Sequence, residues 1–240
     1  SGLDPRARIE MRELLRELPM DTVRELPQFL EAFLGVPYHV LVRFGRWQEM
    51  LAEPEPEAWQ KGRRAYWHYG RGVALAALGR VAEARAERDA YRAAVAEVPA
   101  DWMHGNNPTA TVLAVGDAFL DGELEFRAGD HDRAFAALRL AVERDDAVRY
   151  DEPWAWMMPA RHGLGALLLE AGRVAEAEQV YRRDLERHPE NGWSLRGLAE
   201  CLQRRGAAAE AAAVSARFAA AWQNATAPIE ASCFCRRRGD

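Results

Sequence analysis

Small and apolar residues recur in the second half of the chain at a spacing of 34 residues. Three apolar pairs show this interval: Leu164 with Leu198, Leu168 with Leu202, and Ala177 with Ala211. Gly165 and Ala199 form a pair of small residues at the same spacing. Two helices cross closely only where the side chains at the contact are small, and longer apolar side chains one turn away fill the flanking grooves. The spacing therefore predicts a repeated helical hairpin.

Five glycines mark the turns of these hairpins: Gly45, Gly79, Gly129, Gly172 and Gly206. The sequence GRVAEA begins at Gly79 and again at Gly172. The first and last intervals between the glycines are 34 residues, whereas the two middle intervals are 50 and 43. Glycine ends a helix readily because it adopts positive φ at little energetic cost. The long intervals predict two loop insertions, PADWMHGNNP (99–108) and RDDAVRYDEPWAWMMP (144–159).

The composition favours an all-α chain. Ala, Leu, Arg and Glu dominate and all favour helix, while the runs of Val, Ile and Thr that are typical of strands are missing. The net charge of -5 argues against nucleic acid as a main partner, because phosphate binding needs a concentrated basic face. No apolar stretch approaches the ~20 residues of a membrane span, and the charged N-terminus lacks a signal-peptide core. With three cysteines, an odd number, the chain is expected in the reducing cytoplasm.

The hairpin pattern resembles the tetratricopeptide (TPR) family, whose 34-residue unit has conserved types of residue at five positions. The unit 158–191 fills these positions with Gly165, Gly172, Ala177, Tyr181 and Pro189. The resemblance implies an all-α, right-handed α-solenoid with two loop insertions, formed as a single domain over 1–240. The expected hairpin units lie near 31–64, 65–98, 115–148, 158–191 and 192–225, between an N-terminal helical segment at 1–30 and a C-terminal tail at 226–240.

Longer stretches are similar to the C-terminal half of a group of bacterial TPR proteins. They include YDEPWAWMMPARHGLGALLLEAGR and HPENGWSLRGLAECL. Longer members of that group carry another helical half upstream of the matching part. The resemblance implies that this chain is a piece of such a protein, and that the missing half covers its N-terminal face.

In TPR proteins the first helix of each hairpin lines a concave groove with one stripe of side chains. Carried onto this chain, the stripe predicts a ligand-binding groove of Tyr66, Tyr69, Phe119, Glu123, Phe126, His162, Trp193, Arg196, Glu200 and Gln203. Aromatic side chains bury area and polar groups fix register, which suits a protein or peptide partner. The alternative is that the aromatic rings only pack the superhelix.

Cys233 and Cys235 suggest a different chemistry. Two thiolates at this spacing can share one soft metal ion or form a redox-active pair. Structural zinc sites prefer a wider spacing and need two further ligands. The candidates for those ligands are Cys201, His68, His104 and His162. The simpler interpretation is a pair of thiols in a tail that packs against the last hairpin.

The two insertions carry the remaining candidates. Large aromatic residues and a histidine lie in or beside them: Trp102, His104, Trp154, Trp156 and Trp193. They either wall off a pocket or anchor the loops to the helices. Asp151 and Glu152, together with Arg161 and His162, would form an acid–base cluster if the insertions folded over them. We expect a non-catalytic binding scaffold without a cofactor. The alternatives are a metal- or redox-linked protein and an enzyme with a site under 99–108 and 144–159.

Overall fold

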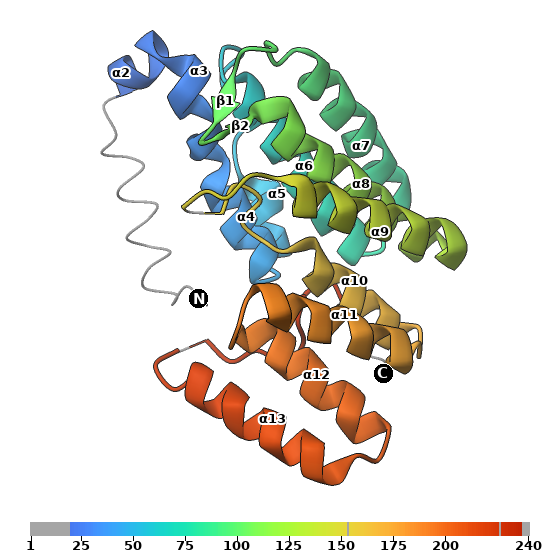
Figure 1. The fold of residues 1–240 in the computed structure, drawn as a ribbon. Helices are drawn as coiled ribbons and strands as arrows, with labels where there is room; N and C mark the ends of the chain where they lie inside the picture. Colours follow the sequence, from blue (N-terminus) through green and yellow to red (C-terminus); the bar gives the residue numbers. More distant parts are fainter. Residues whose placement is uncertain (1–19, 153, 226, 237–240) are drawn as a thin grey trace. The chain divides into compact units, whose positions relative to one another are not determined.

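The computed structural model describes residues 20–152, 154–225 and 227–236. These residues fall into two compact units, which we call the N-terminal unit, ending at residue 160, and the C-terminal unit, beginning at residue 161. The structure is 70% helical, and its helices pack against their neighbours in consecutive pairs (Figure 1). The all-α helical-repeat class predicted from the sequence is confirmed.

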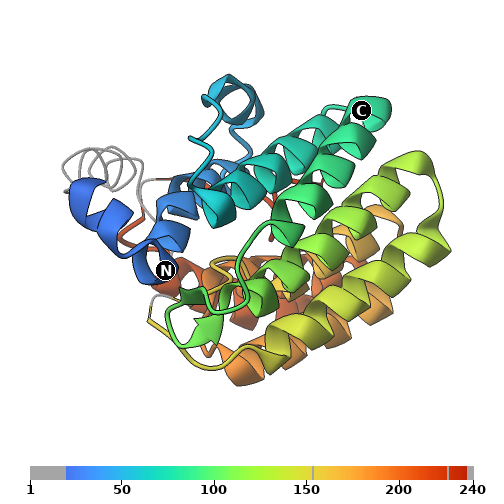
Figure 2. The same cartoon turned by 90° about the horizontal axis from the view of Figure 1, so that it is seen from above.

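The N-terminal unit starts with short helical elements and continues with two long hairpins. The short elements are α2 (Met20–Glu25), α3 (Pro27–Leu30), the 3-10 helix η1 (Glu31–Gly35), α4 (Val36–Arg43) and α5 (Trp47–Ala52). The long helices are α6 (Lys61–Ala77), α7 (Val81–Ala96), α8 (Thr109–Ala128) and α9 (His131–Ala147). Helix α6 packs on α7, and α8 packs on α9, as Figures 1 and 2 show. The part of the predicted N-terminal segment before residue 20 lies outside the described residues.

Local sequence explains where helices α5 and α6 end and begin. Helix α5 stops at Ala52, just before Pro54 and Pro56, because proline lacks the N–H that a helix requires. Glu31 then caps the start of α6, where its carboxylate accepts hydrogen bonds from the backbone N–H of Gly62 (3.0 Å) and of Arg63 (2.7 Å). Burial raises the pKa of Glu31 to about 7, although these two bonds partly oppose the shift.

The insertion 99–108 contains the short strands β1 (Met103–His104) and β2 (Asn107–Pro108), which pair antiparallel. Asn107 fastens this hairpin to the second insertion by a reciprocal pair of bonds. Its side-chain amide donates to the carbonyl of Arg149 (3.0 Å), and its side-chain oxygen accepts from the N–H of Arg149 (2.8 Å). Asp151 accepts a further bond from the N–H of Asn106 (2.8 Å). The two insertions, separated by a whole helical hairpin in sequence, therefore pack against each other.

The C-terminal unit consists of two hairpins and the tail. Its helices are α10 (Ala160–Glu170), which begins at the boundary of the units, α11 (Val174–Arg187), α12 (Gly192–Arg204) and α13 (Ala208–Ala221). The hairpin turns lie at Gly172 and Gly206, with φ of 75° and 76°. Space does not require glycine there, since a Cβ at either position would meet nothing within 4 Å. The positive φ predicted from the glycine spacing is what requires it.

The ring of Tyr181 fits between two glycines of neighbouring helices. A Cβ on Gly165 of α10 would come within 2.5 Å of this ring, and one on Gly197 of α12 within 2.3 Å. The aromatic residue of the repeat therefore packs into the space that the small residue leaves open. At the next turn, Asn191 accepts hydrogen bonds from the N–H groups of Trp193 and Ser194 and so caps α12.

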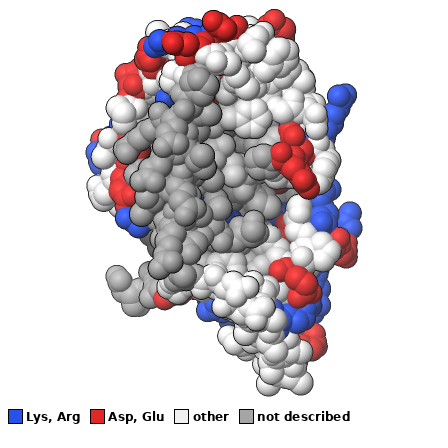
Figure 3. All heavy atoms as spheres, turned by 90° about the vertical axis from the view of Figure 1, so that its left-hand side faces the viewer, with Lys and Arg blue, Asp and Glu red and all other residues white. Residues whose placement is uncertain are grey.

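Charges of both signs are mixed on the surface. Figure 3 shows one face of the molecule, on which Asp and Glu side chains lie close to Lys and Arg side chains. Between α7 and α8, for example, Arg92 pairs with Asp117 (2.7 Å) and Asp121 (2.6 Å). None of the helices in the described ranges combines the length and the apolar character that a membrane span requires.

Candidate functional site

The five predicted groove residues of the N-terminal unit are buried. They are Tyr66 and Tyr69 on α6, and Phe119, Glu123 and Phe126 on α8. The ring of Phe126 stacks on His131 at a centroid distance of 4.7 Å. In this structure the stripe does not provide an open surface on α6 and α8, and its rings pack as the alternative interpretation of the sequence describes.

The two insertions supply the cover over α6. His104, from the first insertion, bonds through Nδ1 to the hydroxyl of Tyr66 (2.7 Å). Trp156, from the second, meets the ring of Tyr69 edge-on at 4.9 Å between centroids and is fully buried. Burial lowers the pKa of His104 to about 4, so this imidazole is neutral at physiological pH. The insertion aromatics thus anchor the loops to the helical body.

The acid–base cluster weighed from the sequence does not form within either unit. Asp151, in the N-terminal unit, accepts from backbone N–H groups of Asn106 and Glu152. His162 lies in the C-terminal unit and is bonded to Asp184. Asp151 and His162 therefore each stabilise the local structure of their own unit. This arrangement gives no support to the enzyme hypothesis.

A cleft of about 440 Å³ opens on the N-terminal unit, where α5 ends early beside α6 and α7. It is lined by Leu51, Arg71, Leu75, Arg80, Glu83, Ala86 and Glu87. Its charged side chains are paired with one another: Arg71 with Glu87 (2.6 Å) and Arg80 with Glu83 (2.5 Å). Glu87 also bonds His68 Nδ1 (2.7 Å). Because each charge already has a partner of opposite sign, the cleft presents no unbalanced charge to a ligand.

A buried polar network joins α10, α11 and α12 in the C-terminal unit. Asp184 accepts from Ser194 Oγ (2.6 Å) and bonds His162 Nε2 (3.0 Å), and all three residues are fully buried. Burial alone would raise the pKa of Asp184, but His162 and Ser194 outweigh it and lower that pKa to about 2. The residue types match a Ser–His–Asp triad, yet the serine donates to the carboxylate and not to the imidazole, so the serine lacks a general base. The network holds three helices in register.

The last four predicted groove residues lie along α12. Trp193 is buried, Arg196 and Glu200 are half-buried, and Gln203 is exposed. The three polar residues are separated by four and three positions, so they share one face of the helix. Here, unlike on α6 and α8, the predicted stripe reaches the surface.

The C-terminal tail lies on this stripe. Phe234 meets Trp193 edge-on, with 6.0 Å between the ring centroids. Arg236 binds Glu200 through both terminal nitrogens, at 2.7 and 2.9 Å. Burial alone would raise the pKa of Glu200, but the bond with Arg236 and the charges of Arg236, Arg204 and Arg196 together outweigh burial and hold that pKa below its ordinary range. The tail therefore supplies an aromatic ring and a cation to the aromatic and acidic members of the stripe.

Ser232 fixes the tail further along the same surface. Its Oγ lies 2.6 Å from the hydroxyl of Tyr181 and donates to the carbonyl of His162 at 2.9 Å. Tyr181 is the aromatic residue that fits between the glycines of α10 and α12. The tail thus contacts α10, α11 and α12 together, which agrees with the simpler interpretation of the cysteine region as a packed tail.

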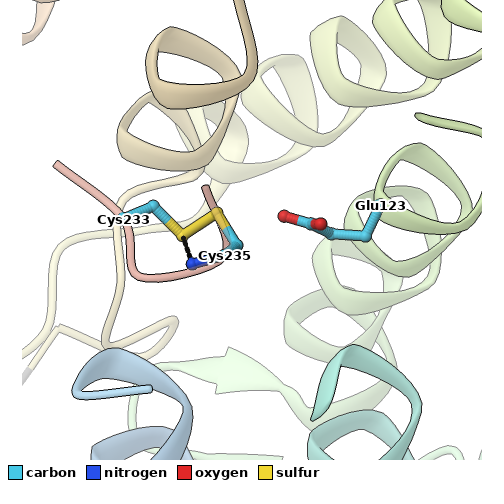
Figure 4. A group of neighbouring side chains, drawn as sticks. All are labelled: Glu123, Cys233 and Cys235. Atoms are coloured by element: carbon cyan, nitrogen blue, oxygen red, sulfur yellow. Dashed lines mark hydrogen bonds between the residues drawn. A yellow bond between two sulfur atoms is a disulfide. The ribbon is translucent and has the colours of Figure 1, made fainter. Parts of the chain in front are cut away.

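Cys233 and Cys235 form a disulfide, whose Cα atoms are 5.2 Å apart, and they pack against Ala166 of α10. Figure 4 shows this bond and the hydrogen bond from the N–H of Cys235 to Cys233 Sγ (3.2 Å); Glu123, also drawn, belongs to the other unit. In the disulfide form neither sulfur is a thiolate that can bind a metal. Burial raises the pKa of Cys201 to about 12, so the third cysteine is a protonated thiol.

The stripe identified Trp193 and Glu200, but it did not show what covers them. The sequence assigned no contact to Ser232, Phe234 or Arg236, because a short tail has no periodic pattern that places it on a helix. The one available signal was the pair of cysteines that flanks Phe234.

Comparison with known proteins supports the helical repeat of the C-terminal unit. Residues 168–224 match a family model described as tetratricopeptide repeat. The matched stretch contains all of α11, α12 and α13. No curated protein and no solved structure matched the chain.

Proposed function

We propose that this chain, a protein of the tetratricopeptide-repeat type through residues 168–224, is a non-catalytic scaffold that binds a protein or peptide with its C-terminal unit. Tetratricopeptide repeats generally mediate protein interactions. The observation that supports this role is the stripe on α12, where Arg196, Glu200 and Gln203 reach the surface beside the ring of Trp193. Of the ten predicted groove residues, these four carry the proposal.

Chemistry of this kind suits recognition of a peptide segment. Trp193 offers a rigid aromatic surface, and such rings are frequent among the residues that dominate binding energy. Glu200 offers a carboxylate that can bind a guanidinium through two parallel bonds. Arg196 and Gln203 add a cation and a side chain that both donates and accepts. A segment that carries an aromatic residue and a cation therefore matches the face in both shape and charge.

The test begins with affinity purification of the full chain from its own cells, followed by identification of the proteins that co-purify. The binding constant of the purified partner is then measured by calorimetry for the wild type and for the R196A/Q203A variant. We expect at least a tenfold weaker affinity for that variant, about 1.4 kcal/mol. The control is Arg183→Ala on α11, since Arg183 is an exposed arginine that pairs with Glu186 away from the stripe. A partner whose affinity is the same for all three proteins would contradict the proposed face.

A second candidate function rests on the Cys233–Cys235 disulfide. A redox-linked protein would alternate between this disulfide and two thiols, with two electrons and two protons supplied by a dithiol reductant. Equilibration of the full chain with glutathione buffers, read by mass spectrometry after alkylation, gives its reduction potential. A potential within the range of cellular redox buffers supports this role, whereas a disulfide that stays oxidised throughout that range removes it.

A further inference from the structure

The tail and the predicted ligand stripe meet at the same residues. The stripe was placed from the resemblance to the tetratricopeptide-repeat family, without the structure, and its aromatic and acidic members on α12 are Trp193 and Glu200. In the structure, Phe234 contacts the first and Arg236 contacts the second. Ser232 bonds the carbonyl of His162, which is another predicted stripe residue. The chain's own tail therefore makes the contacts that a bound peptide would make.

We propose that residues 229–236 act as an internal ligand of the C-terminal unit, and that the partner of this surface is a peptide segment with an aromatic residue followed two positions later by arginine. We call the surface made by Tyr181, Trp193, Glu200 and the carbonyl of His162 the tail-binding surface. This inference rests on the proposed function, because it names the site and the chemistry of its partner.

Each contact of the tail specifies one feature of that partner. The ring of Trp193 accepts an aromatic side chain edge-on, a favourable geometry for two rings. The two oxygens of Glu200 match the fork of a guanidinium, which lysine cannot reproduce. The hydroxyl of Tyr181 and the carbonyl of His162 together bind a hydroxyl group, which a serine two positions before the aromatic residue supplies. The recognised pattern is therefore Ser-x-aromatic-x-Arg.

A partner must compete with the tail for this surface. The tail follows α13 closely in sequence, and the indole N–H of Trp222, just after α13, donates to the carbonyl of Ala227 (2.8 Å). A short tether holds a ligand at an effective concentration in the millimolar range. An external peptide with the same contacts consequently binds the wild-type chain weakly. Weakening the tail alone should raise the affinity for the peptide.

The probe for the experiment is the nonapeptide PIEASCFCR, residues 228–236, labelled with fluorescein at its N-terminus and oxidised to the disulfide. Its binding is measured by fluorescence anisotropy. We expect at least tenfold tighter binding to the full-length F234A/R236A variant than to the wild type, because the variant tail no longer occupies the surface. Adding Glu200→Gln to that variant should weaken peptide binding at least tenfold. Adding Glu186→Gln, a change of an exposed carboxylate on α11 outside the surface, should leave it unchanged.

Variants of the peptide test the same contacts without altering the protein. A probe in which Phe and Arg are both replaced by Ala should not bind the F234A/R236A chain, so the test remains decisive even if Glu200→Gln disturbs the fold. Circular dichroism checks that each protein variant keeps its helical content. Equal affinities of the wild type and the F234A/R236A variant would overturn the proposal. So would a wild-type dimer that dissociates on F234A/R236A, because the tail would then belong to a second copy.

Failure of this inference and failure of the proposed function give different results. If the probe does not bind but a co-purified partner still loses affinity on R196A/Q203A, the scaffold role stands and only the internal ligand is wrong. If the probe binds as expected and no partner depends on Arg196 and Gln203, the surface serves the tail alone. If neither occurs, both proposals fail.

Discussion

The N-terminal and C-terminal units each cover their predicted stripe with an irregular segment, but the covering segments differ in kind. On α6, His104 and Trp156 from two internal insertions cover Tyr66 and Tyr69. On α12, the cover is a terminal tail whose Phe234 and Arg236 contact Trp193 and Glu200. Under our proposal, equivalent repeat positions are core in the N-terminal unit and an exchangeable surface in the C-terminal unit.

The two covers also differ in the chemistry of their contacts. Around α6 the contacts are aromatic rings and a neutral histidine in a fully buried setting, and such contacts strengthen as water is excluded. On α12 the contacts include the Arg236–Glu200 pair, in which both side chains keep 16% of their surface exposed. A partly hydrated ion pair exchanges partners more easily than a buried ring does.

The largest expected effect comes from removing the cover of the N-terminal unit. Trp156→Ala should lower the free energy of unfolding by about 3–5 kcal/mol, because it leaves a large cavity among packed rings. Phe234→Ala, its counterpart on the tail, should cost only about 1 kcal/mol, because it removes one edge-on ring contact. Guanidinium denaturation followed by circular dichroism measures both.

The matched control is Tyr150→Ala, since Tyr150 lies in the same insertion as Trp156 but is 67% exposed. Its effect should stay within about 0.5 kcal/mol. Similar losses for Trp156→Ala and Phe234→Ala would show that the two covers do not differ as described.

The pH dependence should differ in sign between the units. Glu31, with its pKa raised from 4.5 to about 7, stabilises the N-terminal unit fully below pH 4.5, and this stability is lost as the pH rises through 7. Asp184, with its pKa lowered from 3.8 to about 2, stabilises the C-terminal unit above pH 3.8, and this stability is lost as the pH falls through 2. The shifts correspond to roughly 3 and 2 kcal/mol.

Unfolding free energies measured from pH 2 to pH 8 test this pair of slopes. Glu31→Gln should remove the loss of stability between pH 4.5 and 7 and leave the loss of stability below pH 3.8 unchanged. Asp184→Asn should remove the loss of stability below pH 3.8 and leave the loss between pH 4.5 and 7 unchanged. A variant that alters the stability in both pH ranges, or in neither, would contradict the assignment of one carboxyl group to each unit.

A small effect is also expected for the disulfide of the tail. The C233S/C235S variant should lose about 1–2 kcal/mol, because a loop of three residues gains little chain-entropy stabilisation from a disulfide. Hydrogen exchange followed by mass spectrometry should then show faster exchange in 229–236 and unchanged exchange in α12. Reduction of the wild type with a phosphine should reproduce this pattern. Faster exchange throughout α12 would instead make the disulfide part of the unit's core.

Several features of the C-terminal unit were predictable because they are local or strictly periodic. The glycine spacing placed the turns at Gly172 and Gly206, both of which have positive φ. The family resemblance marked a small residue at Gly165 and an aromatic residue at Tyr181, and the structure brings the two into contact. Gly197, on the other side of the same ring, was not singled out, although it is equally necessary for the close approach of α12.

The sequence by itself determined the helical-repeat class, the turns and the helix faces, because these follow from periodicity and from the backbone preferences of glycine and proline. Only the tertiary structure decided which stripe residues are core and which form a surface. That outcome depends on contacts such as Trp156 on Tyr69 and Arg236 on Glu200, made by irregular segments far from the helices in sequence. Irregular segments have no period that places them on a helix, so folding in three dimensions brings these residues together.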